Sequence, residues 1–466
     1  MKRTLVLNVV GLTPSLLQHA PHLRALAANG GLRPLTTVTP AVTATVQSTL
    51  LTGTLPSEHG IVANGWYFRD LSEVWLWRQS NRLVHGEKVW EAAKRRDASF
   101  TCAKLFWWYN MYATADWTVT PRPMYPADGR KLPDIYTQPA GLRDELNREL
   151  GEFPLFRFWG PTADIESTRW IGRCALRIFG QQRPTLTLVY LPHLDYNLQR
   201  LGPADPAIAR DVAAVDEVCG ELIAAARHMD AEVVVLSEYG ITPVDRPVHI
   251  NRALREAGLL AVREELGREQ LDAGASEAFA VADHQLAHVY VARPERVPEV
   301  AQLLRSLPGV ERVLDAEGKR GFGLDHPRSG ELVAIADAHS WFTYYHFLDD
   351  ERAPDYARTV DIHRKPGYDP VELFVDPRLR LPKLRIAARL AQKFLGFRYL
   401  MDVISLDASL VRGSHGRLTD HADDGPLFIT TRPELLGAGP VAAVDVKNLL
   451  LAHVFGSAAA DSRSAA

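Results

Sequence analysis

Short apolar runs alternate with helical patterns along this chain, and this alternation limits the possible folds more than any other feature. Residues 5–10, 185–190 and 232–236 are runs rich in Val, Leu and Thr that have the length of buried strands. Residues 164–179 and 206–229 show helical spacing, and each precedes one of these runs. The pattern predicts a central, mostly parallel sheet flanked by helices, with ligands collecting beyond the carboxyl ends of its strands.

Two long segments do not follow this alternation, and we expect them to be insertions. The first covers about residues 65–160 and carries most of the tryptophans, and the second covers about residues 252–399. A strand at residues 426–429 and an amphipathic helix at residues 441–454 then return to the main pattern. We therefore predict one α/β domain over residues 1–466, with two caps inserted above the strand ends.

Composition and charge narrow the class of protein and its partners. With 466 residues, of which 46% are hydrophobic, the chain can bury a large core. The net charge of −3 and the scattered basic residues give no electrostatic reason to expect a nucleic acid or an anionic membrane as partner. The three widely spaced cysteines suit buried thiols in a reducing compartment. No stretch is long enough to span a bilayer, and the apolar start of the chain is too short for a signal peptide, so we expect a soluble cytoplasmic protein.

The most informative polar segment surrounds Thr43. Residues 39–53 are rich in Thr and Ser, and Thr43 stands where a helix is expected to begin. The first turn of a helix has unpaired N–H groups and the positive end of the helix dipole, so a hydroxyl there can be an activated nucleophile in an anion cradle. Such a cradle suits a phosphoryl or sulfuryl group. Taken alone, Thr43 would be better explained as an N-cap residue.

The residues around Thr43 resemble a known catalytic block. Thr43, the pair Thr52 and Gly53, and residues 55–61 resemble the nucleophile block of the alkaline phosphatase superfamily, most closely that of its nucleotide pyrophosphatase/phosphodiesterase branch. The resemblance implies an alkaline-phosphatase-like fold and hydrolysis of a phosphodiester or pyrophosphate bond in a small, nucleotide-like substrate, with Thr43 as nucleophile. It also implies two zinc ions, which hold the phosphoryl group and stabilise the leaving oxygen.

The first metal site implied by the resemblance is only partly kept. Asp195 matches the family's aspartate ligand, and His415 matches the histidine of a late Ser/Thr-His-Gly block. Gln199 stands where the family has another histidine ligand. This site therefore keeps two of its three expected ligands.

The second implied metal site departs further from the family. Val10 stands where an aspartate would end the first strand, and Glu238 and Tyr239 replace an adjacent Asp-His pair. A carboxylate at position 238 can still bind a metal or act as a base, whereas valine cannot and tyrosine is a rare ligand. Thr43 is kept without its expected metal neighbours.

Three explanations remain open, and we place a rearranged metal site first. In it, Asp195 and His415 hold one or two divalent ions, most simply zinc, with Glu238 completing the site and with Asp361 and His363 as spare ligands. The second explanation is a catalytically degenerate protein that binds a phosphate group or nucleotide on the same fold. In the third, which we place last, the threonine works without metal and uses Glu238 or His363 as general base.

Further candidates for substrate contact lie near these blocks. Asn64 could reach a substrate anion, Tyr239 faces the same site, and Trp107 and Tyr109 could form an aromatic wall for a flat group. The histidines of residues 283–288 lie in an expected strand, and we expect them to be structural or cap residues, with lining of the cleft as the alternative.

Overall fold

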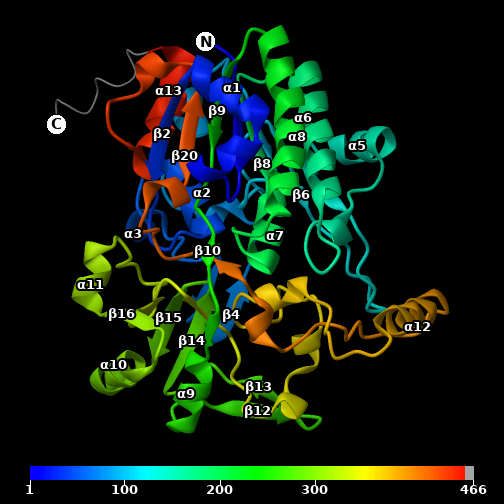
Figure 1. Ribbon diagram of the computed structural model, residues 1–466, viewed down its shortest axis with the longest axis vertical. Coiled ribbons are helices and arrows are strands. Elements are labelled where there is room, and N and C mark those ends of the chain that lie inside the picture. Colours follow the sequence, from blue (N-terminus) through cyan, green and yellow to red (C-terminus); the bar gives the residue numbers. More distant parts are fainter. Residues whose placement is uncertain (457–466) are drawn as a thin grey trace.

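A nine-stranded sheet forms the main layer of the computed structural model, which describes residues 1–456 (Figure 1). The strand order is β21-β2-β20-β9-β1-β8-β5-β6-β7, and the pairs that β1 makes with β8 and β9 are parallel. Only β7 and β20 pair antiparallel to their neighbours. The strands are β1 (Thr4–Val9), β2 (Gly31–Thr36), β5 (Cys102–Leu105), β6 (Trp117–Pro121), β7 (Ile135–Gln138), β8 (Leu186–Leu191), β9 (Glu232–Leu236), β20 (Leu427–Thr430) and β21 (Val441–Ala442).

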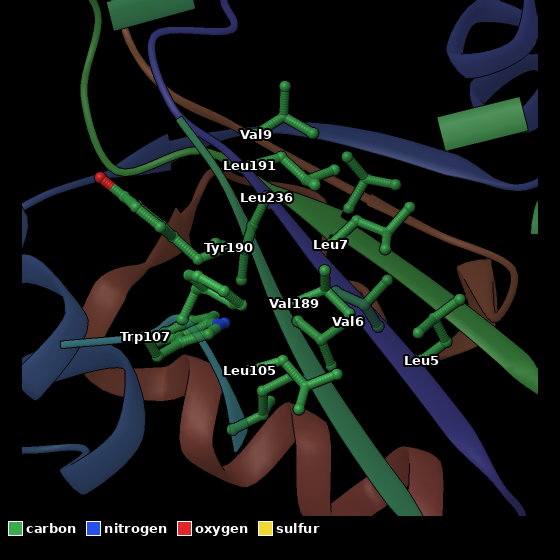
Figure 2. Close-up of a cluster of buried hydrophobic side chains, with 14 of the residues drawn as sticks. Leu5, Val6, Leu7, Val9, Leu105, Trp107, Val189, Tyr190, Leu191 and Leu236 are labelled. Carbon is green, nitrogen blue, oxygen red and sulfur yellow. The ribbon is translucent and has the colours of Figure 1, made fainter. Parts of the chain in front are cut away.

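Helices cover this sheet, as the sequence predicted. One group packs together as α1 (Pro21–Asn29), α6 (Ile165–Gln182) and α8 (Ile208–His228), and a second as α2 (Thr43–Thr52), α4 (Val89–Arg96) and α13 (Val446–Phe455). Every residue of β1 and β8 is buried, as expected for central strands covered on both faces. Figure 2 shows the result: Val6 and Val189 pack in one apolar cluster with Leu105. The predicted α/β architecture is thus confirmed.

A second sheet with its own apolar core lies below the main layer in Figure 1. It is antiparallel, with the order β14-β15-β17-β16, and it falls within the second expected insertion. Its strands are β14 (Ala278–Asp283), β15 (Leu286–Val291), β16 (Val310–Leu314) and β17 (Leu332–Ala336), with α9 (Ile250–Glu256) and α10 (Val297–Ser306) beside them. The β14–β15 turn meets the main layer, because Gln285 N–H donates to the carbonyl of His415 at 2.9 Å.

The segment 65–160 differs from the expected cap. Its first part forms the hairpin of β3 (Gly65–Phe68) and β4 (Glu73–Leu76), which lies against β14. Its later part supplies β5, β6 and β7, which extend the central sheet. These strands have only four or five residues each, too few to show a periodic pattern in the sequence. The tryptophans that suggested a cap include Trp90 and Trp107, which are core residues of the main layer.

Smaller differences have local causes. The helical segment after β1 consists of a 3-10 turn, Pro14–His19, and α1, because Pro21 lacks an N–H and begins a new helix. Among the residues that the structure describes, no helix is both long and apolar enough to cross a bilayer.

The remaining elements are α3 (Pro56–His59), α5 (Leu142–Leu150), α7 (His193–Leu201), α11 (Ala316–Gly321), α12 (Pro382–Phe394), β10 (Thr242–Pro243), β11 (Arg246–Val248), β12 (Val262–Glu265), β13 (Arg268–Leu271), β18 (Ser340–Phe342) and β19 (Gly413–Ser414).

Candidate active site

Thr43 is the first residue of α2, and its hydroxyl lies at the carboxyl ends of the central strands. Thr43 Oγ1 is 2.9 Å from the hydroxyl of Tyr239, which follows β9. The Tyr239 hydroxyl donates to Asp195 Oδ1 at 3.4 Å, and Asp195 lies in the first turn of α7, just after β8. Since the phenol has one proton, this arrangement makes Thr43 the donor to the Tyr239 oxygen. Three segments that follow β2, β8 and β9 of the same sheet thus bring a hydroxyl, a carboxyl and a phenol into one hydrogen-bonded chain.

Asp195 is held by an amide on its other side. Gln199 Nε2 donates to Asp195 Oδ2 at 3.0 Å, and the hydroxyl of Tyr368 donates to Gln199 Oε1 at 2.9 Å. Burial raises the pKa of Asp195 to about 7, although the hydrogen bonds from Tyr239 and Gln199 favour its charged form. The amide that replaces the family's histidine is therefore committed to orienting this carboxyl, and it presents no free oxygen to a metal.

Glu238 is the second buried carboxyl beside Thr43. Its Oε1 accepts hydrogen bonds from Asn8 Nδ2 and from Gln47 Nε2, the latter at 2.6 Å, and its Oε2 has no hydrogen-bond partner in the described part of the chain. Burial is the main cause that raises the pKa of Glu238 to about 8, while the hydrogen bonds from Gln47 and Asn8 act against it. Glu238 is therefore mostly protonated at neutral pH, so it serves as a base only in alkaline solution.

Two neighbouring histidines form another side of the site. The His415 ring stacks on Tyr239 with 3.6 Å between centroids, and on its other side lies His284, at 3.7 Å. His415 Nδ1 donates to the carbonyl of Ala41 at 2.8 Å, and His284 Nδ1 is 2.7 Å from Asp283 Oδ1. Burial lowers the pKa of both imidazoles well below the usual range, so both are neutral. With the proton on Nδ1, the Nε2 of each ring carries a lone pair, and neither has a partner among residues 1–456.

Asn64 connects the start of α2 to the second sheet. Its Oδ1 accepts from the N–H of Ala44 at 2.9 Å, while its Nδ2 and backbone N–H donate to the two carboxylate oxygens of Asp283 at 3.0 and 2.7 Å. Burial raises the pKa of Asp283 to about 6. The sequence indicated Asn64, but for Asp283 and His284 it favoured a structural or cap role over lining the cleft. Their position at the tip of a hairpin could have suggested a role in the site, because a turn can project toward a neighbouring layer.

The two expected aromatic contacts are buried in different cores. Trp107 has no exposed surface and packs beside Tyr190 in the main core (Figure 2). Tyr109 is 3% exposed and belongs to a small cluster that contains Ala44 and Trp66. Neither ring presents a free face to solvent, so the aromatic wall expected from the sequence is filled by protein.

Asp361 and His363, the spare ligands expected from the sequence, lie outside helices and strands. The backbone N–H of Asp361 donates to Glu372, and His363 lies beside the backbone of Leu76 and near several cationic side chains. Within residues 1–456 neither side chain forms a hydrogen bond or an ion pair with Asp195. These contacts do not support the role of spare ligands at Asp195.

The zinc site expected from the sequence is not formed by Asp195, His415, Glu238, Asp361 and His363 as they are arranged. No group of three or more His, Cys, Asp or Glu side chains within residues 1–456 is placed to hold a metal ion, whereas a catalytic zinc ion needs three protein ligands. Asp195 and His415 approach each other, with 3.8 Å between Oδ1 and Nε2. Val10 supplies no lone pair, and the Tyr239 hydroxyl contacts Thr43 directly.

The family described as type I phosphodiesterase / nucleotide pyrophosphatase matches residues 4–369. The chain belongs to this family. The match includes Thr43, Asp195 and Glu238 and ends before His415. Family membership confirms the resemblance inferred from the sequence and places the chain among phosphoric ester hydrolases.

Solved structures of low sequence identity share the fold along nearly the whole chain. Phosphonoacetate hydrolase from Sinorhizobium meliloti 1021, in complex with phosphonoformate, is 16% identical with a TM-score of 0.62, over 97% of this chain and 96% of that chain. An inactive threonine-to-alanine variant of murine ectonucleotide pyrophosphatase/phosphodiesterase 5, in complex with AMP, is 15% identical with a TM-score of 0.58, over 97% and 95% of the two chains. These likenesses confirm the fold. No curated protein matches the chain.

Proposed function

We propose that this chain hydrolyses a phosphodiester or pyrophosphate bond of a small phosphorylated substrate, with Thr43 as the nucleophile. The observation that supports this most is the hydrogen-bonded chain from Thr43 through Tyr239 to Asp195, with distances of 2.9 and 3.4 Å. It begins at the positive end of α2, where a phosphoryl group is favoured. AMP and phosphonoformate, the ligands of the two structural neighbours, are likewise small molecules that carry a phosphate or phosphonate group.

The proposed reaction follows from these contacts. Thr43 Oγ1 attacks phosphorus as the bond to the leaving oxygen breaks, and the displaced group departs as its oxyanion. The hydroxyl proton passes to the Tyr239 oxygen while the phenol proton passes to Asp195 Oδ1, whose pKa of about 7 suits a base at neutral pH. Water then attacks phosphorus and the bond from phosphorus to the threonine oxygen breaks. The proton held by Asp195 returns through Tyr239 to that oxygen, and the proton that the water loses leaves with the phosphate product or to solvent.

The divalent ion implied by the family resemblance remains a prediction. Asp195 and His415 offer one carboxylate and one imidazole lone pair, one ligand fewer than catalytic zinc requires. Metal analysis of the purified protein tests this prediction independently of catalysis. A stoichiometric ion that is lost in an Asp195→Asn variant would support it, and metal-free protein with full activity would contradict it.

A catalytically degenerate binding protein is the second candidate, and it is favoured by the closure of the site. The side chain of Thr43 is only 4% exposed, and Val10 and Tyr239 stand where the resemblance expects metal ligands. Such a protein would bind a phosphorylated ligand through the start of α2 without turning it over.

The test uses the purified protein and bis(p-nitrophenyl) phosphate. Thr43→Ala should lower kcat by at least about a thousandfold, as expected when a covalent nucleophile is removed. Thr45→Ala is the matched control, because this residue lies in the same turn of α2 and its hydroxyl has no partner in the described residues. Equal activity of Thr43→Ala and wild type would refute the nucleophile. Tight binding of AMP without any turnover by wild type would support the binding protein instead.

A further inference from the structure

A stretch near the end of the second insertion has a composition unlike the rest of the chain. Residues 377–401 contain no acidic residue, and the carboxylates of Asp376 and Asp402 mark its two borders. Helix α12 (Pro382–Phe394) forms its centre and projects from the body of the molecule, at the right of Figure 1. The basic residues of the stretch are Arg378, Arg380, Lys383, Arg385, Arg389, Lys393 and Arg398.

The helix is amphipathic, and its apolar side faces outward. No residue of α12 is buried, and the half-buried positions include Ile386, Arg389 and Lys393, which follow each other at intervals of three and four along one side. Leu384 is 63% exposed, and Phe394 is 91% exposed. A surface helix of a globular protein normally turns its apolar stripe toward the core, so this orientation leaves the stripe without a partner.

Exposed apolar side chains are concentrated here. Of the 18 large hydrophobic side chains that are exposed in the described residues, seven lie between residues 381 and 400. Four of them continue the surface beyond the helix: Leu395 is 69%, Phe397 67%, Leu381 65% and Leu400 39% exposed. Scattered exposed apolar residues are normal, whereas a contiguous group marks an interaction surface. We call the outward side of residues 381–400 the α12 surface.

The charge around the α12 surface is positive and largely uncompensated. Arg385 and Arg389 form ion pairs with Asp402. Lys383, Arg380 and Arg398 form no ion pair with the described residues. Free cations therefore flank an apolar stripe, the pattern that characterises helices lying in the interface of an anionic bilayer.

We propose that the α12 surface docks this protein onto an anionic lipid bilayer, with α12 lying in the plane of the interface. Leu384, Phe394 and Leu395 would enter the boundary between headgroups and acyl chains, while Lys383 and Arg380 contact lipid phosphates. With 13 residues, α12 is too short to cross a bilayer.

A second copy of the chain fits this surface less well than a membrane does. A symmetric dimer through α12 would place the free Lys383, Arg380 and Arg398 of one copy near those of the other, without acidic residues to compensate. An anionic bilayer satisfies both the apolar stripe and the cations. The expectation that no membrane partner exists rested on the net charge of −3, which hides this local excess of positive charge.

The test is co-sedimentation of the full-length protein with vesicles of phosphatidylcholine alone or of phosphatidylcholine with phosphatidylglycerol. We expect binding to the anionic vesicles that weakens with added salt, and little binding to the neutral ones. Phe394→Gln with Leu395→Gln should weaken vesicle binding by about tenfold or more, because two large side chains no longer enter the interface. Leu266→Gln is the matched control, because this fully exposed leucine lies in the β12–β13 turn, away from the basic stretch.

Several outcomes would overturn the proposal. These are equal binding to both vesicle types, equal binding by the double variant and wild type, or no binding to vesicles. A concentration-dependent dimer in sedimentation velocity that the double variant loses, without vesicle binding, would assign the α12 surface to a second copy. The thermal midpoint of the double variant should equal that of wild type, since neither side chain is buried. Hydrolysis of bis(p-nitrophenyl) phosphate is measured separately, so failure of either proposal is visible by itself.

Discussion

Replacing Glu238 by glutamine should change how the stability of the protein depends on pH. The pKa of Glu238 rises from 4.5 to about 8 on folding, mainly because burial disfavours the charged carboxylate. The folded state therefore holds this proton more tightly than the unfolded chain does. Its contribution to stability is complete below about pH 4.5 and is lost as the pH rises through about 8.

The size of the effect follows from the same two values. A difference of about 3.5 units, at about 1.4 kcal/mol per unit, corresponds to about 5 kcal/mol between acidic and alkaline solution. Glutamine has nearly the shape of the protonated acid and does not ionise, so the variant keeps the hydrogen bonds that Oε1 accepts from Asn8 and Gln47. At pH 9 the Glu238→Gln variant should be more stable than wild type by several kcal/mol, whereas at pH 5 the two should differ little.

The assay is urea unfolding followed by tryptophan fluorescence at pH 5, 7 and 9. Asp195, whose pKa is raised to about 7, titrates in both proteins, so its effect largely cancels in the difference. Glu217→Gln, a change at a side chain on α8 that is 70% exposed, is the control and should give a curve parallel to wild type. A difference between Glu238→Gln and wild type that stays constant from pH 5 to 9 would show that Glu238 is not held protonated by burial.

Two further substitutions test buried polar contacts. Lys365 is 1% exposed, and its Nζ lies 2.7 Å from Asp369 Oδ2 and 2.8 Å from Glu372 Oε1. Lys365→Met should destabilise the fold by about 3–5 kcal/mol, because two buried carboxylates lose their cation. A loss below about 1 kcal/mol in urea unfolding would contradict this ion-pair geometry. Asn64→Ala removes the acceptor of the Ala44 N–H and should cost about 1–3 kcal/mol, measured as a lower thermal midpoint. Asn64→Asp, which keeps the acceptor but places a second carboxyl beside a buried one, should not restore wild-type stability.

The central fold could be predicted from the sequence because its strands are continuous apolar runs. β1, β8 and β9 were located to within one residue at each end, and the helices before β8 and β9 to within a few residues. The short strands β5, β6 and β7 were missed, because four or five residues flanked by aromatic side chains resemble an irregular cap as much as a sheet edge. Sequence spacing does not distinguish a tryptophan that packs in a core from one that covers a binding site.

The candidate site was predictable where its residues follow strands of one sheet. Thr43, Asp195 and Tyr239 meet because α2, α7 and the segment after β9 all begin at the same edge. Asp283 and His284 come from the second sheet, and no local pattern encodes how two sheets are oriented. The charge of the α12 surface was overlooked for a similar reason, since a sum over 466 residues averages out a basic run of 25.

The site is formed by residues of both sheets, because the β14–β15 turn reaches it from the second sheet. Thr43 belongs to the layer of the nine-stranded sheet, whereas Asp283 and His284 belong to the antiparallel one. A rigid-body rotation that separates the two layers would expose the buried Thr43. The same motion would withdraw the Asp283 carboxylate from Asn64 and the His284 ring from His415. Substrate entry and disassembly of the pocket would then be one event, so turnover would be limited by how often the layers separate and close again.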